Sequence, residues 1–351
     1  MKDRSYSEQV DIDNTLRLRE IIAPLPPYVK DFFRGITPRT QSRTRLAYSY
    51  DLTVFFQFLH ENNPVLGKKD ISGITLSDLE SLRPADFEEY LDYLQAYDDK
   101  TNELKTNHEG GQKRKLASLR SFYRYFIQRE DISYNPVELV ALPKIHEKAI
   151  TRLDIDEVAM FLDQVDSGDA LTERQQAFHE RTRLRDAALL TLMLGTGIRV
   201  SECVGLNIND VDFNNDGIRI HRKGGKETVV YFSDEVEDAL RNYLSERRQI
   251  NAAEGHENAL FLSLQKKRIS VRAVENLVKK YAETVTTVKH ITPHKLRSTY
   301  GTSLYRETGD IYLVADVLGH SDVNTTKKHY AALEDERRQR ARNAVKLRDT
   351  E

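Results

Sequence analysis

The spacing of apolar residues along the chain predicts a mainly helical protein. In the first third, apolar side chains recur every three or four residues over two long stretches, which begin near residues 39 and 112. This is the period of an amphipathic helix. A third apolar stripe predicts a helix over 84–97. Thr37-Pro38 has the form of an N-cap followed by proline at the first helical position, so it is expected to open the first long helix.

The pattern changes in the middle of the chain. Residues 186–193 are almost continuously apolar, which indicates a buried helix. From 206 to 232 the period shortens toward two residues, and Asn214–Gly217 and Lys223–Lys226 have the composition of tight turns. This stretch predicts a small antiparallel sheet, after which helical periodicity returns from Asp234 onward.

Proline-containing segments divide the chain into domains. Asn135-Pro136 and Leu142-Pro143 interrupt the helical pattern, and 145–150 has the character of a linker. Thr151-x-x-Asp154 then has the form of a capping box that starts a new helix. We therefore expect an extension over 1–27, a helical domain over 28–145, and a mostly helical domain over 151–351 that holds the sheet and ends in a helix. A chain of 351 residues is long enough for two such cores.

Composition narrows the class of protein. The chain has 53 Lys+Arg against 55 Asp+Glu, so its total charge does not indicate nucleic acid, although the segment 266–297 is locally basic. The single cysteine, Cys203, excludes an intramolecular disulfide, and no Cys/His cluster predicts a metal site. Because the sequence has no apolar run long enough to cross a membrane, we expect a cytoplasmic protein without a membrane partner.

Basic residues stand near the starts of the predicted N-terminal helices. Cationic side chains at helix N-termini make good phosphate contacts. Two further cations lie in the Lys223–Lys226 turn and in the basic segment. The candidate DNA contacts are Arg39, Arg43, Arg45, Lys113, Arg114, Lys115, Lys226 and Arg272.

The last third of the chain carries groups suited to a phosphodiester. A planar guanidinium can hold two phosphate oxygens at once and stabilise the charge that develops on them, and Arg199 and Arg297 are the candidates. His294 precedes Arg297 by three residues, so the two share one face of a helix. An imidazole can accept a proton or donate to phosphate, and His320 is a second such group.

The order Arg … His-x-x-Arg … Leu-Gly-His … Tyr resembles that of the tyrosine recombinase (integrase) family, which breaks and rejoins DNA through a phosphotyrosine. The resemblance is strong over 186–330, whereas 28–145 is weakly similar to the core-binding domain of the family. It implies catalytic roles for the two arginines and two histidines above, and it makes Tyr330 the nucleophile. The nearby Tyr300, Tyr305 and Tyr312 are expected in the core because they fall on apolar helical positions.

The resemblance also implies two further roles. Lys223 would protonate the leaving 5′-oxygen, with Lys226 of the same turn as the alternative, and Glu202 would support the active site. Two positions depart from the family pattern. Tyr330 lies ten residues after His320, one more than in many Xer proteins, and Ser298 stands where many relatives have histidine.

The resemblance implies site-specific recombination without metal, ATP or another cofactor. Four protomers would assemble on two double-stranded DNA sites and exchange strands through 3′-phosphotyrosine intermediates and a Holliday junction. The charged helix expected after Tyr330 would pack on a neighbouring protomer.

The biological role stays open between two alternatives. A Xer-like recombinase would resolve chromosome dimers at a dif-like site, in the service of chromosome partition and cell division. An integrase would serve DNA integration of a mobile element at attachment sites. The compact form and the Arg222–Lys226 segment favour the first, whereas the spacing before Tyr330 favours the second. A type IB topoisomerase shares the chemistry but would relax DNA without site specificity. The alternative from another class is a DNA-binding relative that has lost catalysis.

Overall fold

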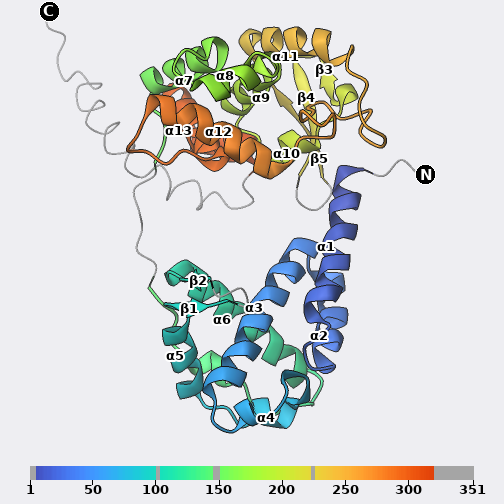
Figure 1. Cartoon of the computed structure of the whole chain (residues 1–351), viewed down its shortest axis with the longest axis vertical. Coiled ribbons are helices and arrows are strands. Elements are labelled where there is room, and N and C mark those ends of the chain that lie inside the picture. The colour runs from blue at the N-terminus through green and yellow to red at the C-terminus, as the bar shows by residue number, and fades with distance from the viewer. Residues whose placement is uncertain (1–4, 100–102, 145–150, 223–225, 320–351) are drawn as a thin grey trace, which may run out of the picture. The chain divides into compact units, whose positions relative to one another are not determined.

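The computed structural model describes residues 5–99, 103–144, 151–222 and 226–319, and the chain divides into two compact units, 1–148 and 149–351. Both units are mainly helical, and each contains one small antiparallel sheet (Figure 1). The expected mainly α fold is thus confirmed. Among the candidate catalytic residues, Lys223, His320 and Tyr330 lie outside the described residues, as does the expected terminal helix.

The first unit is a helical bundle with a two-stranded antiparallel sheet at its side. Short 3₁₀ turns connect several of its helices, the first of them η1 (Thr37–Arg39). The main elements are α1 (Tyr6–Ile22), α2 (Tyr28–Ile36), α3 (Ser42–Asn62), α4 (Leu76–Glu80), α5 (Pro84–Tyr93), β1 (Tyr97–Asp98), β2 (Leu104–Lys105) and α6 (Glu109–Ile127).

An aromatic core holds this bundle together. Phe56 of α3, Phe122 of α6 and Phe32 of α2 are almost completely buried, and their rings meet edge to face. Helix α1 packs along α3, and Leu18 and Ile22 join the same core. Part of the segment expected as an extension is therefore integral to the first unit.

Two predicted helix boundaries in the first unit were wrong. Thr37-Pro38 starts η1 instead of the long helix, because Thr40 and Gln41 are extended and α3 begins only at Ser42. Helix α5 ends at Tyr93, before the predicted end, because Tyr97 pairs with Lys105 in the small sheet.

The second unit is built around one buried helix, α9. Its elements are α7 (Ile155–Ser167), α8 (Glu173–His179), α9 (Arg183–Thr196), α10 (Val200–Gly205), β3 (Val211–Asp212), β4 (Gly217–His221), β5 (Glu227–Tyr231), α11 (Asp234–Arg247), α12 (Val271–Val285), α13 (Pro293–Thr308) and α14 (Ile311–Leu318). Helix α9 packs against α7, α11 and α13. The expected burial of this helix is confirmed, since every residue from Ala188 to Leu194 is buried.

The predicted sheet of the second unit is confirmed. Strands β3, β4 and β5 are antiparallel and adjacent in chain order, with Ile218 opposite Val230. The predicted capping box at Thr151 was wrong by one turn. Asp154 is the N-cap of α7, and the Glu157 carboxylate accepts a hydrogen bond of 2.8 Å from the Asp154 backbone N–H.

Candidate active site

A sharp turn between α9 and α10 positions Arg199. Gly197 ends α9 with a φ of +62°, a backbone conformation that favours glycine. A Cβ at this position would overlap Tyr300 of α13 and come within 2.9 Å of Leu318 Cδ2. The turn is therefore fixed by the backbone conformation of Gly197 and by the close approach of α13 and α14. It places Arg199 at the N-cap of α10.

Glu202 fixes the orientation of Arg199. Its Oε2 accepts a hydrogen bond of 2.7 Å from the Arg199 backbone N–H, and its Oε1 accepts one of 2.8 Å from Nη1. The Glu202 side chain is only 5% exposed, whereas that of Arg199 is 39% exposed. The buried Glu202 carboxylate thus binds both the backbone N–H and the guanidinium group of the partly exposed Arg199. This geometry suits a residue that supports the active site.

Arg297 lies deeper than Arg199. It belongs to α13 and is 5% exposed. Nη1 donates to the Gly197 carbonyl at 2.7 Å, and Nη2 donates to the Leu318 carbonyl. Arg199 Nη2 donates to the next carbonyl, that of Gly319, at 3.2 Å. The structure therefore brings the two predicted arginines together at the C-terminal end of α14.

His294 stands in the first turn of α13, directly after Pro293. Its side chain is exposed, and Arg297 follows one turn later on the same helix. Ser298, where many relatives carry histidine, donates a hydrogen bond of 3.1 Å to the His294 carbonyl. The departure at Ser298 is thus accommodated within the helix.

A third arginine, which sequence reasoning missed, reaches the same end of α14. Arg222 follows β4, and its Nη1 and Nη2 donate to the carbonyls of Asp316 and Val317 at 3.1 and 2.6 Å. The signal was present in the sequence. By the two-residue period of β4, position 222 continues the face of Ile218 and Ile220, which are buried.

The tyrosines near the predicted nucleophile differ in environment. Tyr305 is buried, and Tyr300 is partly buried against Leu318, where burial raises the pKa of its hydroxyl. The expectation of a core position was wrong for Tyr312, which is 64% exposed near the start of α14. Cys203 is buried as expected, and burial raises the pKa of its thiol.

Six of the eight candidate DNA contacts are exposed, whereas Arg45 and Lys115 are not. Arg39, Arg43, Lys113 and Lys226 are exposed, and Arg272 is exposed beside Glu275 at 3.2 Å. Arg45 is partly buried and donates to the carbonyls of Thr37, the first residue of η1, and Thr40, its C-cap.

Lys115 requires a correction, since its side chain is buried. Its Nζ lies 3.1 Å from Oδ1 of Asp51, whose side chain is completely buried, and Arg114 binds the other carboxylate oxygen. Lys115 lies on the inner face of α6 and belongs to the core, so its prediction as a phosphate contact was wrong. Arg114 keeps an exposed side chain despite the ion pair.

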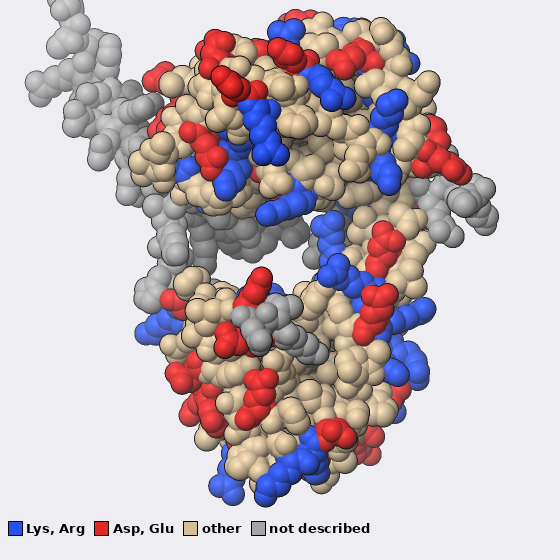
Figure 2. Space-filling model, viewed as in Figure 1, with Lys and Arg blue, Asp and Glu red and all other residues tan. Residues whose placement is uncertain are grey.

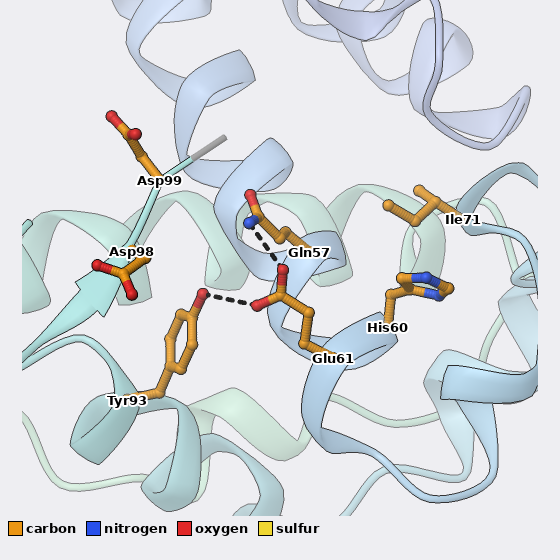
Figure 3. A pocket seen from close by; sticks show the side chains of 7 residues that line it. All are labelled: Gln57, His60, Glu61, Ile71, Tyr93, Asp98 and Asp99. Carbon is orange, nitrogen blue, oxygen red and sulfur yellow. Dashed lines mark hydrogen bonds between the residues drawn. The ribbon is translucent and has the colours of Figure 1, made fainter. Parts of the chain in front are cut away.

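A pocket in the first unit is lined by acidic side chains (Figure 3). Glu61 accepts hydrogen bonds from Gln57 at 2.9 Å and from the Tyr93 hydroxyl at 3.2 Å, while Asp98 and Asp99 line the other side. Burial and the neighbouring Glu61 carboxylate raise the pKa of Tyr93. Carboxylates repel phosphate, so this pocket is not a candidate for holding the DNA backbone.

On the face displayed in Figure 2, charge alone does not mark a DNA-binding surface. Figure 2 shows Lys and Arg interspersed with Asp and Glu over both units on the face that it displays. Among the described residues, no helix is long and apolar enough to cross a membrane, and no three His, Cys, Asp or Glu side chains form a group that could bind a metal ion. The arginine geometry is therefore the most specific chemical feature.

Comparison with known proteins agrees with this geometry. Residues 152–337 match the phage integrase family. The chain is 33% identical to tyrosine recombinase XerC of Caldanaerobacter subterraneus subsp. tengcongensis over 86% of this chain and 82% of the relative. It is 29% identical to tyrosine recombinase XerS of Lactococcus lactis subsp. cremoris over 93% and 97%.

A similar fold occurs in a solved structure of XerH site-specific recombinase bound to palindromic difH substrate. The TM-score is 0.63 at 19% identity, and the likeness covers 86% of this chain and 80% of that one. The match over more than half of the chain and the identity to curated relatives lead to the same conclusion: the chain belongs to the phage integrase family and is a tyrosine recombinase.

Proposed function

We propose that this tyrosine recombinase cleaves and rejoins double-stranded DNA at a specific site, with Tyr330 as the nucleophile. The observation that carries the proposal is the meeting of Arg199 and Arg297 at adjacent carbonyls of α14. Two guanidinium groups held at neighbouring backbone carbonyls are suited to the non-bridging oxygens of one phosphodiester.

Each chemical step has a residue in this chain that is suited to it. The Tyr330 hydroxyl attacks the phosphorus and gives up its proton to His294 or to solvent. A 3′-phosphotyrosine forms while the bond to the 5′-oxygen breaks, and Lys223 protonates that oxygen. Glu202 holds Arg199, and His320 supplies a further donor to the phosphate. The roles of Lys223, His320 and Tyr330 come from the family pattern.

The free energy of the broken bond is retained in the phosphotyrosine, so rejoining needs no ATP. The 5′-hydroxyl of the partner strand attacks the phosphotyrosine and releases Tyr330. Two rounds, separated by a Holliday junction, recombine the two sites. Because each cleaved strand needs one Tyr330, we propose that four protomers assemble on two sites.

For the biological role we propose Xer-like resolution of chromosome dimers at a dif-like site, in the cytoplasm. The similarity to relatives named XerC and XerS over most of the chain supports this role, which would connect the protein to chromosome partition and cell division. Integration of a mobile element at attachment sites is the second candidate. It is favoured by one observation, the ten-residue spacing between His320 and Tyr330.

A nicked suicide substrate tests the chemistry, since loss of the short strand traps the covalent intermediate. Wild-type protein should form an adduct, and Tyr330→Phe should bind the same DNA without forming one. Adduct formation by the Phe variant would remove Tyr330 from this role. Recombination between plasmid-borne sites then separates the two biological roles, since a dif-like palindrome should suffice for a Xer protein.

A further inference from the structure

Arg222 connects the sheet of the second unit to the end of α14. Its backbone N–H donates to the Lys226 carbonyl at 2.8 Å, which continues the pairing of β4 with β5. Its partly buried side chain donates to the Asp316 and Val317 carbonyls. Arg222 therefore joins a strand and a helix that are almost a hundred residues apart in the sequence.

The end of α14 offers four consecutive carbonyls, and three arginines bind them in order. Arg222 donates hydrogen bonds to the carbonyls of Asp316 and Val317. Arg297 donates to the Leu318 carbonyl, and Arg199 donates to the Gly319 carbonyl. The Asp316 carbonyl also accepts a hydrogen bond of 2.8 Å from the Gly319 backbone N–H. Carbonyls at a helix C-terminus carry partial negative charge, so they attract cations. One short helix end thus serves as the common frame for all three guanidinium groups.

Fixing this frame is important because α14 is short. It spans Ile311–Leu318 and ends at Gly319 with a φ of +62°. The last turns of helices fray unless other groups bind their carbonyls. A displaced Leu318 or Gly319 carbonyl would change the direction in which Arg297 or Arg199 points.

We propose that Arg222 is a positioning residue for strand cleavage. It holds the carbonyl end of α14 in place and thereby aligns Arg199 and Arg297 for the scissile phosphate. The inference rests on the proposed function. Arg222 acts through the other two arginines, so its loss should affect the rate of cleavage and leave the affinity for DNA nearly unchanged.

The test compares Arg222→Met, which keeps the apolar stem without donors, with Arg219→Met. Arg219 lies on the same strand with an exposed side chain, so it controls for charge. Cleavage of the suicide substrate by Arg222→Met should fall roughly 10- to 100-fold, as for a small misplacement of a catalytic group. The dissociation constant for intact DNA should change less than about threefold. Arg219→Met should cleave at the wild-type rate.

Two further measurements separate positioning from general stability. Arg222→Lys, which retains one donor group, should recover part of the rate. In combination with Arg199→Lys, the loss caused by Arg222→Met should be smaller than in the wild-type background, since residues that act as a unit are not additive. Arg222→Lys also serves as the test variant if Arg222→Met melts below the assay temperature.

Two results would overturn the proposal. The first is cleavage by Arg222→Met and Arg222→Lys at the wild-type rate. The second is full rescue of Arg222→Met by a 5′-bridging phosphorothiolate, whose sulfur leaves without protonation, because the effect would then lie at the leaving group. If the wild-type protein itself forms no adduct on any dif-like or attachment site, the proposed function fails instead.

Discussion

Arg297 and Arg199 donate to consecutive backbone carbonyls, those of Leu318 and Gly319. The same carbonyls belong to the Leu-Gly-His segment that precedes the predicted nucleophile in the sequence. The two guanidinium groups are therefore oriented in the folded chain before any phosphate binds. Such preorganisation lowers the reorganisation that the chemical step would otherwise require.

Replacement of either arginine by lysine should uncouple binding from cleavage. Arg199→Lys and Arg297→Lys keep the charge and lose the planar pair of donors, so single-turnover cleavage should fall by about 10²- to 10³-fold with little loss of affinity. Arg219→Lys is the control, because Arg219 of β4 has an exposed side chain and is not among the candidate DNA contacts. Near-normal cleavage by both variants would show that these arginines are ordinary phosphate contacts without a catalytic role.

A substrate with a better leaving group should separate Lys223 from Lys226. A general acid matters only while the 5′-oxygen needs a proton. A 5′-bridging phosphorothiolate should therefore rescue cleavage by Lys223→Ala and leave the behaviour of Lys226→Ala nearly unchanged. The reverse pattern would exchange their roles.

Truncation after Tyr330 should separate DNA binding from assembly. The segment 331–351 is charged and contains neither glycine nor proline, which predicts a helix. If this helix packs on a neighbouring protomer, its removal should leave binding to a single site intact and abolish synapsis in gel-shift and recombination assays. Full recombination by the truncated protein would place the coupling between protomers elsewhere.

Loss of Asp51 should destabilise the first unit. Its carboxylate is the partner of buried Lys115, so Asp51→Ala leaves that ammonium without its counter-charge, at a cost of about 3–5 kcal/mol. Urea denaturation followed by circular dichroism measures the change. Asp31→Ala is the control, since its pair with Arg34 is exposed, and its effect should stay below about 1 kcal/mol. Equal effects of the two variants would contradict the importance of burial.

The ion pairs of Lys289 should make stability depend on pH. Hydrogen bonding from Lys289 lowers the pKa of Asp154, so this stabilisation is complete above the pKa of the unfolded chain and is lost as pH falls through the lower folded value. Hydrogen bonds to Glu157 and Asp154 raise the pKa of Lys289, so its contribution is present below the unfolded value and is lost as pH rises through the folded one.

Lys289→Met should therefore lower the melting temperature at pH 7 more than at pH 3. Lys279→Met provides the comparison, because the pair of Lys279 with Glu283 is exposed. A decrease for Lys289→Met that is the same at both pH values would show that the lost packing of the side chain, and not its ion pairs, is responsible.

Sequence reasoning succeeded where a local rule determines the structure. The apolar run over 186–193 gave the buried helix, and Pro293 marks the start of α13, with His294 and Arg297 one turn apart. It failed where tertiary contacts decide. Lys115 has the composition of a surface cation, yet the face of α6 on which it lies turns it toward Asp51. Tyr312 occupies an apolar helical position, yet 64% of it is exposed.

The candidate active site shows the same difference between what a local sequence rule determines and what tertiary contacts determine. The types of catalytic residue follow from the chemistry, and their order is the feature of the sequence that resembles the tyrosine recombinase family. Their convergence on α14 cannot, because backbone carbonyls carry no sequence signature. This is why Arg222 was missed, although it stands next to the predicted general acid.

Gly319 has a consequence for how this chain can vary. A Cβ at position 319 would overlap the guanidinium of Arg222, in addition to the strain that a φ of +62° imposes on other residues. In a relative with a short residue at position 222, a Cβ at position 319 would meet no guanidinium. Only the positive φ would then restrict the residue at 319, and asparagine can also adopt it. Positions 222 and 319 should therefore covary: non-glycine residues at 319 should be found in relatives that have no arginine at 222.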